Sequence, residues 1–284
     1  MLAVGIARDP TYTPGRHSVN DRLILELTAA ALRKHGWSVR LMAEEDVGKR
    51  SLGTRYVFSM CQGPRATALL AGLERQGYAI VNSPAGVQKC YRERLFDLPA
   101  DLRDVFPETL VVSTRSPDRA SRRWIRKQPL WVKRGDVQAT CPEDVQRVES
   151  TSQMEDVLAG FAARGIERAV VQQHVDGKVV KFYGVIGSSF FRFYMESDHA
   201  SAPAAVGQAR SWIERVIRHV GLGLYGGDCV LQRDGGIAII DVNDWPSFSY
   251  FRDEAAAAIA RYVACRFQLH RERALERPGG RVST

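Results

Sequence analysis

The stretch from residue 225 to residue 248, YGGDCVLQRDGGIAIIDVNDWPSF, constrains the fold of this chain more than any other. It contains two apolar strands joined by the dipeptide Asp234-Gly235, a strong signal for a tight β-hairpin turn. A two-residue loop at that dipeptide brings Asp228 of the first strand directly opposite Asp241 of the second. The alternation of side chains along a strand places Asn243 on the same face. The hairpin is therefore predicted to gather two carboxylates and an amide.

Two like charges opposite each other destabilise a sheet, so a cation is expected between Asp228 and Asp241. Carboxylate and amide oxygens are hard ligands, and Mg²⁺ is usually held by one or two carboxylates together with substrate phosphates. We therefore expect these two acids and Asn243 to bind magnesium. The alternative is an acidic pair that faces solvent and binds nothing. A slip of the turn by one residue would also break the pairing.

Length and composition are those of an ordinary globular protein. The chain has 284 residues, of which 45% are hydrophobic and 25% charged, enough for a full core and two or three subdomains. No apolar run is as long as a membrane span, and the first residues lack the pattern of a signal peptide. Five cysteines without a CxxC pair favour reduced thiols and a cytoplasmic protein, with Cys61, Cys90 and Cys229 buried in the core.

The net charge of +8 favours an anionic partner, such as nucleic acid, an anionic membrane or a polyanionic small molecule. Basic residues are concentrated in 115–127 and 261–281, although such stretches are more often solvated faces than binding sites. Residues 277–284 are expected to form a disordered tail. The sequence contains no RNA-binding aromatic motif and no helix-turn-helix signal, which disfavours a nucleic acid partner.

The first part of the chain alternates strands and helices, which predicts a parallel α/β unit. Ser18 and Asp21 form a capping-box pattern at the start of its first helix. Ligands bind at the carboxyl ends of such strands, so Arg8, Arg16 and His17 are candidate substrate contacts, with loop solvation as the alternative. Strands are expected at 1–7, 37–42, 56–60 and 78–81, and helices from residue 18 to Gly36 and from residue 65 to Gly77.

The rest of the chain mixes helices with strands that are not separated by regular crossovers. One helix is expected from residue 84 to about residue 98, and Ser152 with Glu155 is expected to cap another. The remaining expected strands are 109–113, 130–133, 168–173, 179–186 and 189–195, and the remaining expected helices are 152–163, 204–220 and 253–267.

Several of these stretches resemble, in the same order, the ATP-grasp superfamily. Lys133, at the end of LWVK, resembles the phosphate-binding lysine on the family's small central subdomain. The segment VVQQHVDG, residues 170–177, is similar to the linker that clamps adenine. Lys181 in VVKFY resembles the next basic residue, which reaches the phosphates. The resemblance covers about residues 78–263.

The resemblance implies a set of functional residues and the cofactors ATP and Mg²⁺, with two metal ions. Backbone groups from Gln173 to Val175 would pair with the base edge, Asp176 would lie near the ribose, and Arg94 stands where the family often has lysine. The implied cofactor-binding residues are Arg94, Lys133, Gln172, Gln173, His174, Val175, Asp176 and Lys181; the catalytic residues are Lys133, Lys181 and Asp241; and the metal ligands are Asp228, Asp241 and Asn243.

The resemblance also implies a fold that is α/β overall and α+β in its catalytic part. An N-terminal parallel α/β unit, residues 1–95, would precede an ATP-grasp domain, residues 96–284, in which two α+β subdomains clamp the nucleotide. Residues 108–174 would form the small lid subdomain, and residues 175–270 would form the metal-binding subdomain.

Two functions compete within this resemblance. Most ATP-grasp enzymes are ligases that phosphorylate a carboxylate, which an amine then attacks. The ligases similar to glutathione synthetase and to the ribosomal-protein glutamate ligases usually have a Gly-rich loop after the first lysine. They also usually have the motif Glu-x-Asn at the metal. Here that loop has one glycine, and the metal motif begins with Asp241, which is closer to the inositol trisphosphate kinases. Their loop histidine is missing, with Gln138 nearest. We expect phosphoryl transfer to a small anionic acceptor, with a carboxylate–amine ligase as the alternative.

A third possibility is a non-catalytic protein that binds a nucleotide or a nucleic acid. A polynucleotide binder would lose affinity steeply with salt and would not need ATP. An enzyme would instead be stabilised by Mg²⁺ together with a nucleotide. No membrane partner is expected, and the oligomeric state is left open.

Overall fold

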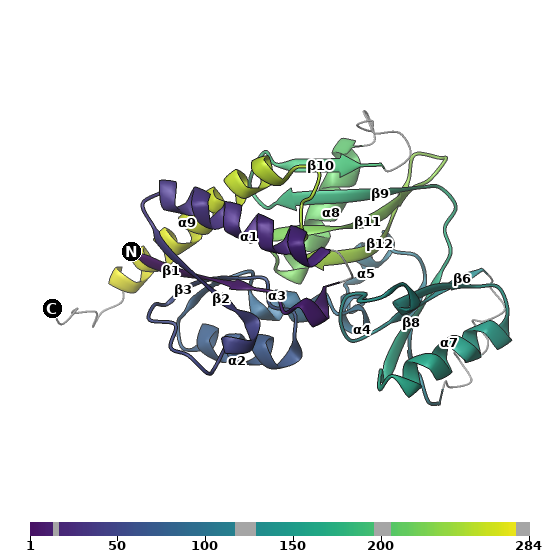
Figure 1. The fold of residues 1–284 in the computed structure, drawn as a ribbon. Helices are drawn as coiled ribbons and strands as arrows, with labels where there is room; N and C mark the ends of the chain where they lie inside the picture. Colours follow the sequence, from purple (N-terminus) through teal and green to yellow (C-terminus); the bar gives the residue numbers. More distant parts are fainter. Residues whose placement is uncertain (14–16, 117–128, 196–205, 277–284) are drawn as a thin grey trace.

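A computed structural model describes residues 1–13, 17–116, 129–195 and 206–276, and these residues build three four-stranded sheets. The predicted tail, the candidate contact Arg16 and most of the basic stretch 115–127 lie outside the described residues. Figure 1 shows the N-terminal unit on the left, the last sheet above and to the right, and a small separate unit at the lower right. None of the described helices is both long and apolar enough for a membrane crossing.

The N-terminal unit is the predicted parallel α/β structure, and its observed strands and helices match the expected ones closely. The alternation of apolar strands and amphipathic helices produces two buried clusters, one on each face of the sheet. The strands lie in the order β2-β1-β3-β4, all parallel. The elements are β1 (Leu2–Ala7), α1 (His17–Lys34), β2 (Ser38–Ala43), β3 (Tyr56–Ser59), α2 (Pro64–Arg75) and β4 (Ala79–Val81), with short 3₁₀ turns at Pro10–Tyr12 and Glu44–Asp46.

The predicted capping box at the start of α1 is wrong. Asp21 does not cap the helix; its carboxylate instead accepts hydrogen bonds from Arg8 Nη1 at 2.8 Å and from Thr13 Oγ1 at 3.0 Å. Through these two hydrogen bonds, Asp21 in the first turns of α1 holds the loop that follows β1.

The segment after β4 is broken, where one helix was expected. It forms α3 (Pro84–Lys89), α4 (Arg92–Leu95) and α5 (Ala100–Arg103). Tyr91 interrupts the helix with an extended backbone, φ −60° and ψ 127°, and its hydroxyl donates to the carbonyl oxygen of Gln62 at 2.6 Å. Tertiary contact therefore overrides local helix propensity here, and the break sets the direction of Arg92.

The small unit at the lower right of Figure 1 is an antiparallel sheet covered by one helix. Its strands are β5 (Thr109–Ser113), β6 (Leu130–Arg134), β7 (Val145–Val148) and β8 (Arg168–Gln173), in the order β5-β8-β6-β7. The helix α7 (Thr151–Ala163) packs on it through Met154, Leu158 and Phe161. Its N-cap is Ser150, which accepts from Gln153 N, so the expected cap at Ser152 is wrong by two residues.

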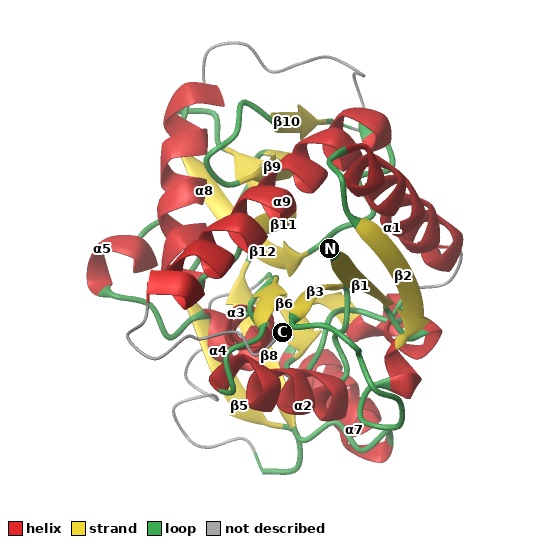
Figure 2. Cartoon of the chain, turned by 90° about the vertical axis from the view of Figure 1, so that its left-hand side faces the viewer, coloured by secondary structure: helices red, strands yellow, loops and turns green. Residues whose placement is uncertain are grey.

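The last sheet is antiparallel, with the order β10-β9-β11-β12. Its elements are β9 (Lys178–Val185), β10 (Phe191–Tyr194), α8 (Val206–Val220), β11 (Leu224–Leu231), β12 (Ile237–Asp244) and α9 (Arg252–Glu276). Helix α9 is longer than expected and lies beside α1 (Figures 1 and 2). Trp37 packs on Phe267 of α9 with ring centroids 5.2 Å apart. One buried cluster therefore joins the N-terminal unit to the last sheet, and the division at residue 95 stays a prediction.

The β11–β12 hairpin has the predicted pairing of Asp228 with Asp241, but its turn and its register differ from the prediction. Its loop has three residues, since Gln232 N donates to Gly236 O and Gly235 has a left-handed φ of 86°. This shifts the register by one at the turn, where Leu231 faces Ile237. A β-bulge then leaves Ile240 unpaired, and Asp228 faces Asp241 as predicted. The two-residue turn was wrong, and the carboxylate pairing is confirmed.

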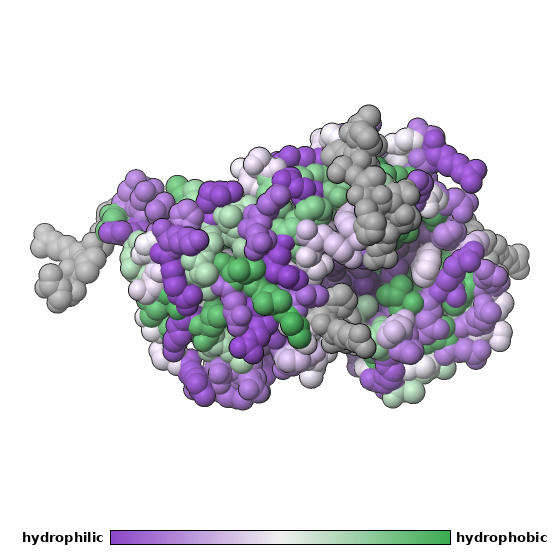
Figure 3. Space-filling view, turned by 45° about the horizontal axis from the view of Figure 1, so that its top comes forward, coloured by the Kyte–Doolittle hydropathy of each residue, from purple (hydrophilic) through white to green (hydrophobic). Residues whose placement is uncertain are grey.

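The surface in Figure 3 is largely hydrophilic, with apolar side chains in small groups. Cys61, Cys90 and Cys229 are buried free thiols, as expected.

Candidate functional site

A cavity of about 600 Å³ lies where the three sheets meet. Residues of β6 and β8 line it from the small unit, residues of β9, β11 and β12 line it from the last sheet, and loops that follow β1 and β3 close its other end. Of the predicted site residues, the cavity lining includes Arg8, Lys133, Gln172, Gln173, His174, Val175, Lys181, Asp228, Asp241 and Asn243.

Three charged residues form a row across neighbouring strands. Lys181 of β9 faces Asp228 of β11, which faces Asp241 of β12. Lys181 Nζ lies 3.2 Å from Asp228 Oδ1, and Arg92 Nη2 of α4 lies 2.5 Å from Asp241 Oδ2. Burial raises the pKa of Asp228, while Lys181 acts in the opposite direction. Each acid is thus already paired with a cation, and all four side chains border the cavity.

The residues present fit a magnesium site that is completed by phosphate oxygens. Asp228, Asp241 and Asn243 supply hard oxygen ligands. The side chain of Asn243 makes no hydrogen bond within the described part of the chain. Asp241 Oδ1 accepts from Val242 N at 3.1 Å and its Oδ2 accepts from Arg92, so Asp241 offers a metal only the remaining lone pairs of these oxygens. No cluster of three or more His, Cys, Asp or Glu side chains suited to a metal occurs among the described residues. The three side chains that are present would leave coordination positions that phosphate oxygens of a nucleotide could fill.

Lys133 is held in the cavity wall by two hydrogen bonds. Its Nζ donates to Gln172 Oε1 and to the carbonyl oxygen of Ile240, each at 2.8 Å. The second acceptor is the residue that the β-bulge leaves unpaired. Burial lowers the pKa of Lys133 to about 8, although the nearby charge of Asp241 favours the ammonium. Gln172, predicted to bind the cofactor, thus positions the lysine.

Arg92 lines the cavity, although no sequence pattern pointed to it. It is 3% exposed, and its Nε and Nη1 have no hydrogen-bond partner among the described residues. Arg94, the residue to which the resemblance pointed, does not line the cavity: its side chain is 54% exposed and lies beside Glu93. The reason is the helix break at Tyr91, because α4 begins at Arg92 and turns that side chain inward.

The proposed adenine end contains residues 172–175 and Trp131. Gln173 N donates to Glu108 O, and His174 N donates to Pro129 O. The backbone N–H of Val175 donates to no backbone carbonyl of the described chain. Trp131 Nε1 donates to His174 Nδ1 at 3.1 Å. Asp176, predicted near the ribose, is 95% exposed at its side chain and does not line the cavity.

The opposite end of the cavity is built by polar residues from the loops that follow β1 and β3 and from the end of β12. Arg8 donates to the carboxylate of Asp21 and to the carbonyl oxygens of Met60 and Trp245. Gln62 Nε2 donates to Asp244 Oδ1 at 2.7 Å. Burial raises the pKa of Asp244 to about 6, against the effects of Arg8 and Gln62.

Of the candidate substrate contacts, Arg8 lies at this end, Arg16 is outside the described residues, and His17 begins α1 with a side chain that is not described. Gln62 and Asp244 were missed. Strand alternation predicts that Asp244 points away from Asn243, but the strand ends there and Trp245 has a left-handed φ of 35°.

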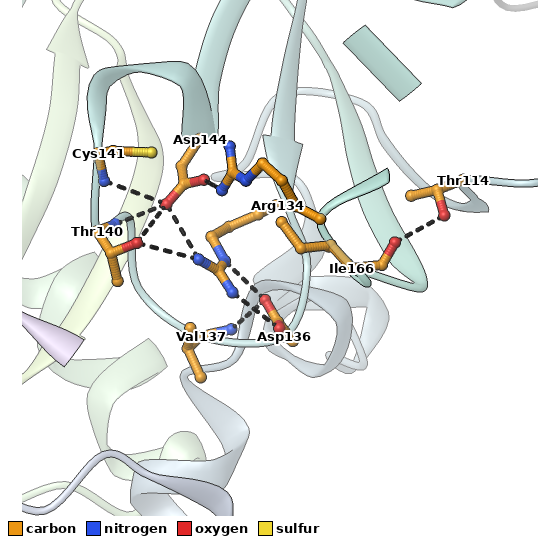
Figure 4. Close-up of polar contacts among 9 residues, drawn as sticks. Thr114, Arg134, Asp136, Val137, Thr140, Cys141, Asp144 and Ile166 are labelled. Atoms are coloured by element: carbon orange, nitrogen blue, oxygen red, sulfur yellow. Dashed lines mark hydrogen bonds and ion pairs between the residues drawn. The ribbon is translucent and has the colours of Figure 1, made fainter. Parts of the chain in front are cut away.

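The loop after β6 is fixed by Asp144, whose side chain is fully buried and whose polar contacts are drawn in Figure 4. Its carboxylate accepts from Thr140 N at 2.7 Å, from Arg134 Nη1 at 3.1 Å and from Arg164. Burial alone would raise the pKa of Asp144, but the hydrogen bonds from Thr140, Arg164 and Arg134 bring it well below its usual value. From this loop, Gln138 Nε2 donates to Val242 O of β12 at 3.1 Å, so the loop borders the cavity.

Solved structures share this arrangement along nearly their whole length. A D-alanine–D-alanine ligase from Bacillus anthracis complexed with ATP has a TM-score of 0.71 at 10% identity, covering 96% of this chain and 99% of that one. A RimK domain ATP-grasp protein from Sphaerobacter thermophilus has a TM-score of 0.64 at 22% sequence identity, covering 92% of this chain and 99% of that one. The VanG D-Ala:D-Ser ligase from Enterococcus faecalis has a TM-score of 0.66 at 13% sequence identity, covering 95% of this chain and 98% of that one. This chain has the ATP-grasp fold.

The β5-β8-β6-β7 sheet lies within the predicted lid residues 108–174, and the β10-β9-β11-β12 sheet lies within the predicted residues 175–270. The division into these two subdomains stays a prediction. No protein-family model and no curated protein sequence matches the chain. The likeness therefore rests on structure, and it establishes the fold.

Proposed function

We propose that this protein is a Mg²⁺-ATP-dependent ligase that joins a carboxylate to an amine through an acylphosphate. The observation that carries the proposal is the cavity itself. One end combines the cations Lys133, Lys181 and Arg92 with the pair Asp228 and Asp241, and the other end is polar with an excess of acids. The ligases among the solved structures of this fold support the same choice.

The chain's residues have distinct roles in this proposal. Asp228, Asp241 and Asn243 would hold magnesium, which neutralises charge developing on the phosphates. Lys133, Lys181 and Arg92 would hold the nucleotide's phosphate oxygens, and the two unpartnered donors of Arg92 suit this task. The segment from Gln173 to Val175, with Trp131, would hold the base.

The proposed ligase reaction has two steps. A carboxylate oxygen attacks the γ-phosphorus of ATP, the bond to the β-phosphate oxygen breaks, and ADP leaves. The amine, an ammonium ion in solution, first loses a proton. Its nitrogen then attacks the acyl carbon, the bond from that carbon to the phosphate oxygen breaks, and an amide and inorganic phosphate result, with one N–H proton passing to the phosphate. The protein supplies positioning and charge neutralisation for both steps.

The kinase function favoured by the sequence has weaker support. A polyanionic acceptor needs spare cations at the acceptor end, but among the described residues that line this end the one cation is Arg8, which is already paired with Asp21. Asp244 adds a second carboxylate there. This end therefore suits a neutral or cationic group better than a phosphorylated one.

An isotope experiment tests the proposal. The protein is incubated with Mg²⁺, ATP and pools of carboxylic acids carrying ¹⁸O in both carboxylate oxygens, with and without amines. We expect ¹⁸O to enter inorganic phosphate when both substrates are present. A stable phosphorylated product that forms without an amine would favour the kinase instead. Binding of polynucleotides that falls steeply with salt, with no ATP turnover, would favour the binding protein.

A further inference from the structure

Gln62 and Asp244 carry two buried hydrogen-bond acceptors that lack donors. The residues are 2% and 1% exposed, and both line the cavity. Gln62 Nε2 donates to Asp244 Oδ1, but Gln62 Oε1 and Asp244 Oδ2 have no hydrogen-bond partner among the described residues. Buried acceptors without donors are rare and destabilising. A ligand that donates to both would satisfy them, and the broad terminal torsions of Asp and Gln allow the oxygens to turn toward it.

The charges around this pair favour a cation. Arg8 is the nearby positive group, and its Nη1 is paired with Asp21 at 2.8 Å. Glu44 lies behind the pair, where its carboxylate accepts from the backbone amides of Asp9, Gln62 and Gly63. Arg8 is thus paired with Asp21 and also acts electrostatically on the carboxylates of Glu44 and Asp244, so three acids share one guanidinium. One added positive charge would improve this balance.

A metal ion suits the place less well than an organic cation. The oxygens of Glu44 are taken by amides, and Asp21 Oδ2 accepts from both Arg8 and Thr13. No metal-ligating cluster of three His, Cys, Asp or Glu side chains occurs in the described ranges. A primary ammonium, in contrast, has three donors and no acceptor, which matches two neighbouring oxygens.

We infer that Asp244 and Gln62 bind the amino group of the second substrate, which is a primary amine that enters this end of the cavity as its ammonium ion. The inference rests on the proposed ligase function for the role of the amine, whereas binding of an ammonium ion can be measured without turnover. It assigns the acceptor substrate to primary amines and excludes alcohols and quaternary amines.

The first test measures binding alone. The protein, saturated with Mg²⁺ and a non-hydrolysable ATP analogue, is titrated calorimetrically with n-butylammonium and, separately, with n-butyltrimethylammonium, which has the same charge and no N–H donor. We expect the primary ammonium to bind about tenfold more tightly or better, the difference that one charge-assisted hydrogen bond produces. Equal affinity for the two ions, or no binding of either, would overturn the inference.

Two variants locate the site. Asp244→Asn and Gln62→Met should each reduce the preference for the primary ammonium to near unity, and the affinity for the Mg²⁺-nucleotide analogue should not change. Asp156→Asn, on the exposed face of α7, is the matched control and should keep the preference. If Asp244→Asn does not fold, Gln62→Met carries the test. An unchanged preference in a folded variant contradicts the inference.

A second readout separates this inference from the proposed function. Hydroxylamine at high concentration traps an acylphosphate as a hydroxamate and needs no amine site. In both variants we expect ATP-dependent hydroxamate formation to persist while the KM for amine substrates rises about tenfold. Absence of hydroxamate in the unsubstituted protein would count against the ligase and leave the binding result intact.

Discussion

Lys133 Nζ lies 2.8 Å from the carbonyl oxygen of Ile240, the one residue of β12 that the β-bulge leaves unpaired. The bulge frees that carbonyl from the ladder and makes it an acceptor for a lysine of the neighbouring subdomain. The same bulge restores the pairing of Asp228 with Asp241. A single irregularity thus aligns the two acids and anchors the lysine beside them.

Replacement of Asp241 should affect both activity and stability. Asp241→Asn removes a proposed magnesium ligand, so Mg²⁺-dependent ATP turnover should be lost. It also removes the charge that balances Arg92, which is 3% exposed, so the free energy of unfolding should fall by up to about 3–5 kcal/mol. Urea unfolding with kinetic assays checks both. Full activity in this variant would exclude the metal assignment.

Asp228→Asn is the matched control. Its partner Lys181 is 37% exposed at the side chain, so loss of this pair should cost only about 0–1 kcal/mol. Equal losses of stability in the Asp228 and Asp241 variants would contradict the different burial of their partners.

Nucleotide binding should weaken above pH 8. The pKa of Lys133 is about 8 without ligand, and bound phosphate favours the ammonium, so binding takes up a proton above that pH. Affinity should therefore be nearly constant below pH 8 and fall as pH rises through 8 and beyond. Calorimetric titration across pH 6.5–9.5 measures this. Lys133→Arg, which stays charged throughout, should bind without that decline, and the same decline in this variant would implicate another group.

The Asp144 network should make the protein sensitive to acid. The folded-state pKa of Asp144 lies below its ordinary value, so its contribution to stability is complete above that value and is lost as pH falls below about 4. Asp144→Asn should be less stable than the parent at pH 7 and should lose less further stability on acidification. Thermal unfolding between pH 3 and pH 7 tests this. Parallel stability curves for the two proteins would refute the assignment.

Gly235 should resist substitution. Its φ of 86° is left-handed, and a Cβ there would meet no other atom within 4 Å, so the cost of alanine is conformational, about 1–2 kcal/mol. Gly236, outside the left-handed region, is the control and should tolerate alanine better. Chemical unfolding of the two variants compares them, and equal losses would argue against a three-residue loop.

Short-range patterns predicted most of the strands and helices, because apolar periodicity and Gly punctuation are local properties. They failed where tertiary contacts decide. The hydroxyl of Tyr91 binds the loop of Gln62 and breaks a helix, so Arg92 enters the cavity in place of Arg94. The hairpin shows the same limit, since the turn was wrong by one residue and only the bulge at Ile240 restored the pairing.

The long helix α9 has a consequence for how the molecule is made. Its residues Ile259, Val263 and Phe267 pack in the same buried cluster as Ala3, Ile24 and Leu32. The first sheet therefore cannot complete its interior until α9 has left the ribosome. A nascent chain should hold this sheet in an unfinished state while the residues between β4 and α9 are synthesised, and α9 then completes its core.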